Sequence, residues 1–269
     1  MRDRRIPPRI SPRGARPIVT LTTDFGLSDH YVAAMKAAIL RENEHIRLID
    51  VTHNVPRHDI LCASITLERA VDGFPPGTVH LAVVDPGVGT QRRLIIAQVA
   101  DQFIVCPDNG LITWTLKLHA PDALPSAREI TWRPKSFSST FHGRDVMSPI
   151  AARIARSEPL NSFSKPIDDP VLLDLAPANA TDPTGKIIHI DHFGNATTNV
   201  RQNLLRDNPR ISIKVNQKSI GKLKRTYWDV APGKPLALIG SICLLEIDVR
   251  DGSARDDLKL HVGDVVALR

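Results

Sequence analysis

The chain has 269 residues, which predicts one large or two modest domains, and its 42% hydrophobic and 24% charged residues exclude a disordered or collagen-like chain. No apolar run reaches the ~18 residues that a membrane span needs, so a soluble protein without a membrane partner is expected. The three cysteines show neither a disulfide framework nor zinc-ligand spacing, which favours a cytoplasmic location.

The formal net charge of +6 is concentrated at the amino terminus. Residues 1–16 contain six arginines and one acid, so the rest of the chain is nearly neutral. Because this segment is also rich in proline and poor in apolar residues, it is predicted to be a flexible basic tail. A nucleic-acid-binding arm is the alternative, but the near-neutral body indicates no nucleic-acid partner.

Residues 17–175 alternate short apolar runs with helical patterns, which predicts an α/β domain with a mostly parallel sheet. Strands are expected at 18–23, 46–51, 79–84, 94–99 and 102–107, and helices at 29–40, 58–71 and 146–155. Ser28 or Asp29 is the candidate cap of the first helix.

The alternation of apolar runs with helical patterns ends at residues 176–184. This stretch is rich in Pro, Ala and Thr and is predicted to be a linker. Residues 185–269 contain short β-like runs separated by Gly, Pro and Asn. Only residues 252–258 have a pattern that indicates a short helix. A small all-β domain, barrel-like or a sandwich, is therefore expected.

Acidic residues follow three of the predicted strands in the first domain. Asp24, Asp85 and Asp108 each come just after an apolar run, and ligands of parallel α/β sheets bind at the carboxyl ends of the strands. The alternative is that these acids merely form turns before glycine. Dinucleotide, P-loop, GxSxG, CxxC and HExxH motifs are absent from the sequence, so no metal site is expected.

Loop residues of the same domain offer a second chemical signal. An aspartate, an arginine and a histidine brought together can hold and deprotonate a water, and Asp85, Arg92 and His142 are the candidates. By spacing alone, Asp85 and Arg92 are equally consistent with a plain salt bridge, and His142 with a loop histidine.

Six segments that contain these residues closely resemble the S-adenosyl-L-methionine (SAM) hydroxide adenosyltransferases, the adenosine-forming SAM hydrolases related to fluorinase and chlorinase. The resemblance extends from about Ile18 to Leu268. The segments are TLTTDFGLSDHYVAAMKAAIL (20–40), VTHNVPRHDI (51–60), FPPGTVHLAVVDPGVGTQRR (74–93), PDNGLIT (107–113), STFHGRD (139–145) and HIDHFGNATTN (189–199).

The resemblance implies a Rossmann-like N-terminal domain, a barrel-like C-terminal domain, and a homotrimer with active sites between subunits. It implies hydrolysis of SAM to adenosine and L-methionine by nucleophilic substitution at C5′. SAM is then the substrate, so no cofactor is expected, and no metal is needed because methionine leaves as a neutral thioether.

The resemblance also assigns roles to matching residues. Asp85, Arg92 and His142 correspond to the catalytic triad, with either His142 or Asp85 taking the proton. The corresponding substrate-binding residues are Asp24 for the ribose, Asp29 for the methionine ammonium, Asn195 for adenine, Ser241 for the methionine carboxylate, and Tyr227, with Trp228 adjacent, for stacking on adenine.

Two positions distinguish hydrolysis from halide transfer. Halogenating relatives have tyrosine at the positions of Asp85 and His142, and the fluoride-binding serine corresponds to Gly143. A carboxylate beside the nucleophile repels a halide, so hydroxide transfer is expected. Ile242 departs from the serine of many relatives and affects the predicted methionine site. A SAM- or adenosine-binding sensor with little turnover is the alternative function.

Overall fold

A computed structural model describes residues 16–120, 127–174, 184–206 and 211–269. The chain divides into two compact units, with the boundary between Leu173 and Asp174. Apart from Arg16 and Thr184, the predicted tail (1–16) and the predicted linker (176–184) lie outside the described residues.

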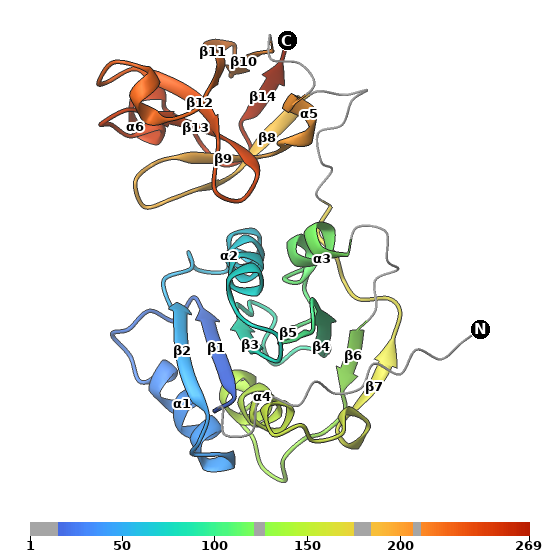
Figure 1. Cartoon of the computed structure of the whole chain (residues 1–269). Helices are drawn as coiled ribbons and strands as arrows, with labels where there is room; N and C mark the ends of the chain where they lie inside the picture. Colours follow the sequence, from blue (N-terminus) through green and yellow to red (C-terminus); the bar gives the residue numbers. More distant parts are fainter. Residues whose placement is uncertain (1–15, 121–126, 175–183, 207–210) are drawn as a thin grey trace, which may run out of the picture. The chain divides into compact units, whose positions relative to one another are not determined.

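The N-terminal unit contains one sheet with helices on both faces (Figure 1). Within the described residues, its seven strands have the order β2-β1-β3-β5-β4-β6-β7. The elements are β1 (Ile18–Thr23), α1 (Tyr31–Glu42), β2 (Arg47–Thr52), α2 (Ile60–Gly73), β3 (Val79–Val83), β4 (Leu94–Val99), β5 (Gln102–Pro107), α3 (Thr113–His119), β6 (Ala127–Ile130), α4 (Ser148–Ala155) and β7 (Ser164–Ile167).

The predicted α/β class is confirmed, and the sheet combines a block of parallel strands with antiparallel strands. β2, β1, β3 and β5 are parallel neighbours. β4 instead turns back as a hairpin on β5 through Ala100 and Asp101, whose φ angles of 50° and 60° suit a tight turn. β6 and β7 continue the sheet antiparallel.

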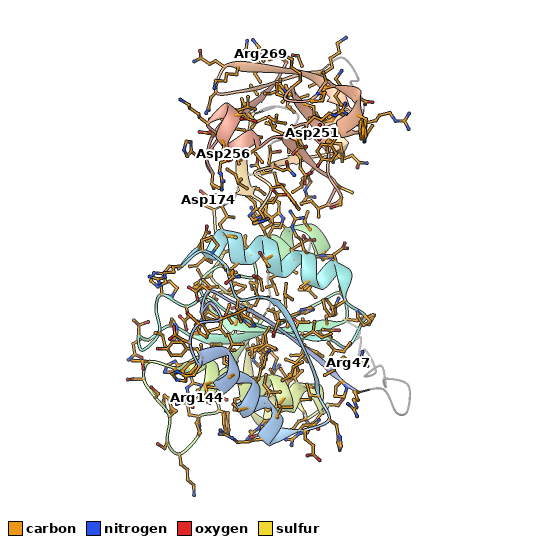
Figure 2. All side chains as sticks on the ribbon, turned by 90° about the vertical axis from the view of Figure 1, so that its left-hand side faces the viewer. Arg47, Arg144, Asp174, Asp251, Asp256 and Arg269 are labelled. Atoms are coloured by element: carbon orange, nitrogen blue, oxygen red, sulfur yellow. The ribbon has the colours of Figure 1, made fainter. Side chains whose placement is uncertain are left out.

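Two apolar cores lie on opposite faces of this sheet. All residues of β3 are buried, because alternate side chains enter alternate cores. Met35 of α1 and Ile150 of α4 pack with Leu81 on one face. Leu67 of α2 packs with Ala82 on the other face. Side chains fill the space between helices and sheet (Figure 2).

The C-terminal unit contains a closed barrel, as the strand pattern predicted (Figure 1). In the described part of this unit the barrel order is β10-β11-β12-β13-β9-β8-β14. Its elements are β8 (Thr184–Ile190), β9 (Ala196–Arg201), α5 (Asn203–Arg206), β10 (Ser212–Val215), β11 (Lys218–Lys224), β12 (Pro235–Ile239), β13 (Leu244–Val249), α6 (Ala254–Leu258) and β14 (Val265–Leu268).

Successive side chains of each strand point alternately into and out of the barrel, and the inward-pointing ones fill it with aliphatic groups. Leu245, Ile247 and Val249 of β13 join one core with Ala196 and Val200 of β9. No helix among the described residues has the length and apolar character to cross a bilayer.

Candidate active site

The sheet brings the strand-end acids to one edge. β1 pairs in parallel with β3, and β3 with β5. Asp24, Asp85 and Asp108 follow these strands, so they share the carboxyl edge where α/β proteins bind ligands. The sequence-based placement of these acids is confirmed, although their contacts differ.

Asp85 and Arg92 form a bidentate ion pair. Arg92 Nε donates to Asp85 Oδ1 at 2.5 Å, and Arg92 Nη2 donates to Asp85 Oδ2. Their side chains are 6% and 10% exposed, so water screens the pair only weakly. A Cβ on Gly87 would lie 3.1 Å from Arg92 Cδ, which shows how closely the loop backbone passes the arginine stem.

His142 completes the group. Its Nδ1 lies 3.2 Å from both Nη1 and Nη2 of Arg92. Burial lowers the pKa of His142, and the positive charge of Arg92 lowers it further. The neutral ring therefore predominates near pH 7. Because Arg92 is always a donor, Nδ1 accepts and the proton of the neutral ring belongs on Nε2.

A π-helical turn, Gly143–Met147, follows His142 and leads directly into α4. π-helical turns are frequent at functional sites. Arg144 and Asp145 form a bidentate pair, and Asp145 Oδ2 also accepts the backbone N–H of Ser138 at 2.8 Å. Arg144 is labelled at the surface of this unit in Figure 2. The pair thus fixes the loop that carries His142.

The other acids of this edge differ in their contacts. Asp24 is half-buried and accepts the backbone N–H of His58 through Oδ2 at 2.9 Å. Asp29 is exposed just before α1. Asp108 is buried and holds Arg93 and the backbone N–H of Val171, so it is a structural anchor and not part of the Asp85–Arg92–His142 group.

Two groups near the triad escaped the sequence reasoning. Phe25, Tyr31 and Phe141 form an aromatic cluster with ring centroids 5.3–5.9 Å apart. The sequence contains a signal for this cluster, because two of its aromatic residues are adjacent to predicted site residues: Phe25 follows Asp24 and Phe141 precedes His142. A polar pocket beside the triad also includes Arg133 and Phe137. Nothing in the sequence pattern distinguished those two residues.

The barrel carries the remaining predicted residues. Asp191 Oδ1 accepts the backbone N–H groups of Phe193 and Asn195 at 2.9 Å, and Asn195 Nδ2 donates to Asp191 Oδ2 at 3.2 Å. Gly194 has φ 87°, and a Cβ there would overlap Ser253 Oγ. The 191–195 turn therefore presents Asn195 in one orientation.

Tyr227 and Trp228 have different surroundings. Burial and the nearby carboxylates of Asp248, Glu246 and Asp191 raise the pKa of Tyr227 to about 12. The indole ring of Trp228 lies 3.9 Å from the Arg250 guanidinium carbon.

Ser241 is exposed in the β12–β13 turn. A Cβ on its neighbour Gly240 would overlap the Glu246 carboxylate. Tyr227 also lies near Glu246, and near Asp191, which holds Asn195. Of the three predicted binding residues of the barrel, Asn195 is held directly by Asp191, and the charges of Asp191 and Glu246 both act on Tyr227.

In the portions of the chain that the structure describes, no cluster of three His, Cys, Asp or Glu side chains can hold a metal ion. The described site offers the chemistry of an ion pair and a neutral imidazole.

The fold and site define a two-domain α/β enzyme with a buried Asp–Arg–His group at the carboxyl edge of its sheet. Models of the SAM hydroxide adenosyltransferase N-terminal and C-terminal domains match residues 19–164 and 185–267. The chain therefore belongs to the SAM hydroxide adenosyltransferase family.

Similar proteins agree with this membership. An (R)-S-adenosyl-L-methionine hydrolase from Salinispora tropica is 38% identical over 259 residues, which cover 92% of this chain and 96% of that protein. An uncharacterized conserved protein from Thermotoga maritima has a solved structure with a TM-score of 0.86 and 34% identity, covering 94% of this chain and all of that one. A fluorinase from Nocardia brasiliensis is a more distant relative, at 23% identity over 70% of this chain and 73% of its own.

Proposed function

We propose that the protein hydrolyses SAM to adenosine and L-methionine, with water attacking C5′ of the substrate. The observation that carries the proposal is the contiguous group of Asp85, Arg92 and His142 in a chain of this family. Relatives that match nearly the whole chain are named SAM hydrolases.

In the proposed reaction one water forms a C–O bond to C5′ while the C–S bond breaks. The bonding electrons leave with sulfur, so methionine departs as a neutral thioether and one proton is released. In-line placement of the water opposite sulfur supplies much of the rate enhancement. A site that replaces bulk water with fixed dipoles also favours a step in which charges cancel.

The geometry supports a separate role for each triad residue. Arg92 stabilises the developing hydroxide through its N–H groups. Asp85 accepts the proton, because a water hydrogen becomes strongly acidic as the C–O bond forms. His142 accepts from Arg92 at Nδ1, so its Nε2–H is the ring donor left to act on the reactants. The Asp85 carboxylate disfavours a halide in the same place.

The remaining expectations are part of the same proposal. Asp24 binds the ribose hydroxyls and Asp29 the methionine ammonium. Asn195 and Tyr227 bind adenine, and Ser241 binds the methionine carboxylate. The assembly is a homotrimer with active sites between subunits, and no cofactor or metal takes part. Free thiols at all three cysteines support a reducing, cytoplasmic location.

The test is to incubate the purified full chain with SAM and to quantify products by chromatography and mass spectrometry. Both sulfur epimers are supplied separately, because the relatives' names carry the (R) designation. We expect adenosine and methionine in equal amounts, with no dependence on chloride or on a chelator. Asp85→Asn should slow turnover about 100-fold or more.

The matched control is Asp101→Asn, which removes an exposed carboxylate in the β4–β5 turn and should leave turnover unchanged. SAM that binds tightly without being consumed would contradict the hydrolase and favour the sensor. Chlorinated or fluorinated product in place of adenosine would contradict hydroxide transfer.

A further inference from the structure

A polar pocket of about 350 Å³ lies beside the triad in the N-terminal unit. Its lining includes Arg92, Arg93, Arg133, Glu129, Phe137 and His142. The volume is enough for roughly ten waters, so it can hold a small hydrated ion. Three arginines against one glutamate give the lining a cationic character.

The charges of this lining differ in whether they are compensated. Arg92 is paired with Asp85. Arg93 is paired with Asp108 and with the exposed Asp169. Glu129 is paired with Lys165 at 3.0 Å. None of these ion pairs involves Arg133.

Arg133 is the exception, although the negative charge of Glu129, which is itself paired with Lys165, acts on it from beyond ion-pair distance. Among the described residues no carboxylate forms an ion pair with it, and its recorded hydrogen bonds go from Nη1 to the carbonyl oxygens of Ile130 and Trp132, both at 2.8 Å. Nε and Nη2 therefore remain as donors on a planar guanidinium. A planar pair of N–H groups matches two oxygens of a phosphate or carboxylate.

We propose that this pocket binds a small phosphate-type oxyanion on Arg133, next to the triad. The methionine carboxylate of the substrate is a poor occupant, because in-line attack places the departing methionine on the opposite side of C5′ from the triad. The pocket is thus a site separate from the proposed SAM site, although it shares Arg92 and His142 with the triad.

An oxyanion here acts on the triad through charge. His142 is influenced by Arg92 and Arg133, whose positive charges lower its pKa, and by Asp85 and Asp145, whose negative charges raise it; burial is the largest effect and lowers it. A bound anion neutralises Arg133 and so raises the pKa of His142. If the proposed function holds, phosphate therefore raises the pH at which the rate of hydrolysis falls on acidification.

The test is calorimetric titration of the full chain with inorganic phosphate, with sodium chloride at matched ionic strength as the screening control. We expect saturable phosphate binding that weakens about tenfold or more in Arg133→Gln and partly returns in Arg133→Lys. Arg255→Gln, which removes one exposed charge in α6, should bind like the wild type. Thermal unfolding verifies that the variants fold.

A second readout is the NMR titration of the His142 ring, which we expect phosphate to shift upward in the wild type and to leave unchanged in Arg133→Gln. Absence of saturable binding, or equal binding by Arg133→Gln, would overturn the oxyanion site. Phosphate binding through Arg133 in a protein that does not consume SAM would uphold the site while the proposed function fails. Hydrolysis without phosphate binding would refute the site alone.

Discussion

At the scale of single residues, the triad depends on the fork of Arg92. The guanidinium holds both oxygens of Asp85 and also reaches His142 Nδ1. A lysine ammonium is a point charge and cannot make all of these contacts at once. Arg92→Lys keeps the charge but loses the geometry, so we expect kcat to fall about 100-fold with little change in thermal stability.

Steady-state kinetics measures this change, and Arg41→Lys, at an exposed position in the last turn of α1, is the control. A kcat within about threefold of wild type would mean that the charge of Arg92 suffices and that its fork has no catalytic part.

The low pKa of His142 predicts how activity responds to acid. Burial and Arg92 lower this pKa below the ordinary 6.5, so the ring is neutral above that pH. Protonation places a second cation against Arg92 and removes the acceptor at Nδ1. We expect kcat to change little from pH 8 to 7 and to fall on acidification with a midpoint below 6.5.

The pH profile of kcat for the wild type and for His142→Asn provides the check. The residual activity of the variant should lack this acid limb. A wild-type midpoint above 6.5, or the same limb in His142→Asn, would contradict the assignment.

At the scale of elements, the 191–195 turn depends on glycine. An alanine at 194 would adopt φ 87° and overlap Ser253, whereas one at Gly221, with φ 100°, has no atom within 4 Å. We expect Gly194→Ala to lower the free energy of unfolding by about 2–4 kcal/mol, against about 1 kcal/mol for Gly221→Ala.

Denaturant unfolding of both variants separates the clash from the backbone strain. The KM for SAM should rise only in Gly194→Ala, because that turn orients Asn195. Equal losses of stability in the two variants would show that Ser253 moves aside without cost.

Strand β13 carries a buried acid on its outer face. Leu245 and Ile247 enter the barrel core, so Glu246 and Asp248 point the other way. Asp248 is fully buried, and neither of its oxygens has a hydrogen-bond partner among the described residues. Burial, with Glu246 and Asp191, raises the pKa of Asp248 from 3.8 to about 7.

This raised pKa has a defined effect on stability. The folded protein holds the Asp248 proton more tightly than the unfolded chain does. The resulting stabilisation is complete below about pH 4 and is lost as pH rises to about 7, by an amount on the order of 3–4 kcal/mol. Asp248→Asn removes this dependence, so its advantage over the wild type grows between pH 5 and 8.

Urea unfolding at the two pH values measures the difference, and Asp251→Asn, at an exposed neighbouring position, is the control. Parallel pH profiles for wild type and Asp248→Asn would show that Asp248 is ionised in the folded protein.

The elements that sequence reasoning located are those whose burial is set by simple patterns. The apolar runs of β1, β3 and β5 predicted strands of an α/β sheet, and the acids after them marked its edge. The start of α1 was wrong, because His30 precedes the helix without a side-chain cap and Ser28 and Asp29 lie outside it. Cap propensity is a local preference that tertiary packing overrides.

The contacts at the edge of the sheet were less predictable than the sheet. Asp24, Asp85 and Asp108 look alike in sequence, yet only Asp85 meets Arg92 and His142, because partner choice depends on loops that lie far away along the chain. The same reason hid Arg133 and Phe137, which reach the pocket from the loop after β6. The membership in the family, by contrast, was carried by whole motifs and is confirmed.

At the scale of the whole molecule, the predicted site is divided between two compact units. The triad with Asp24 and Asp29 belongs to the first, and Asn195, Tyr227 and Ser241 belong to the second. Under the proposed roles a complete site contains both sets, supplied either by one chain or by two. The proposed homotrimer supplies them from neighbouring chains, and that arrangement makes a quantitative prediction.

Asp85→Asn chains and Asn195→Ala chains, each nearly inactive alone, are co-expressed in equal amounts, and each variant carries its own affinity tag. Purification through both tags in succession selects the assemblies that contain both variants. If a site takes its first unit from one chain and its second from the next, every trimer that contains both kinds of chain has about a third of its sites with both units intact. Activity should therefore recover to about a third of the wild-type value at subsaturating SAM. The matched control mixes Asp85→Asn with His142→Ala, whose lesions both lie in the first unit, and should recover nothing because no pairing yields an intact triad. Absence of recovery in the first mixture, with mixed assemblies verified by their tags, would mean that each chain completes its own site.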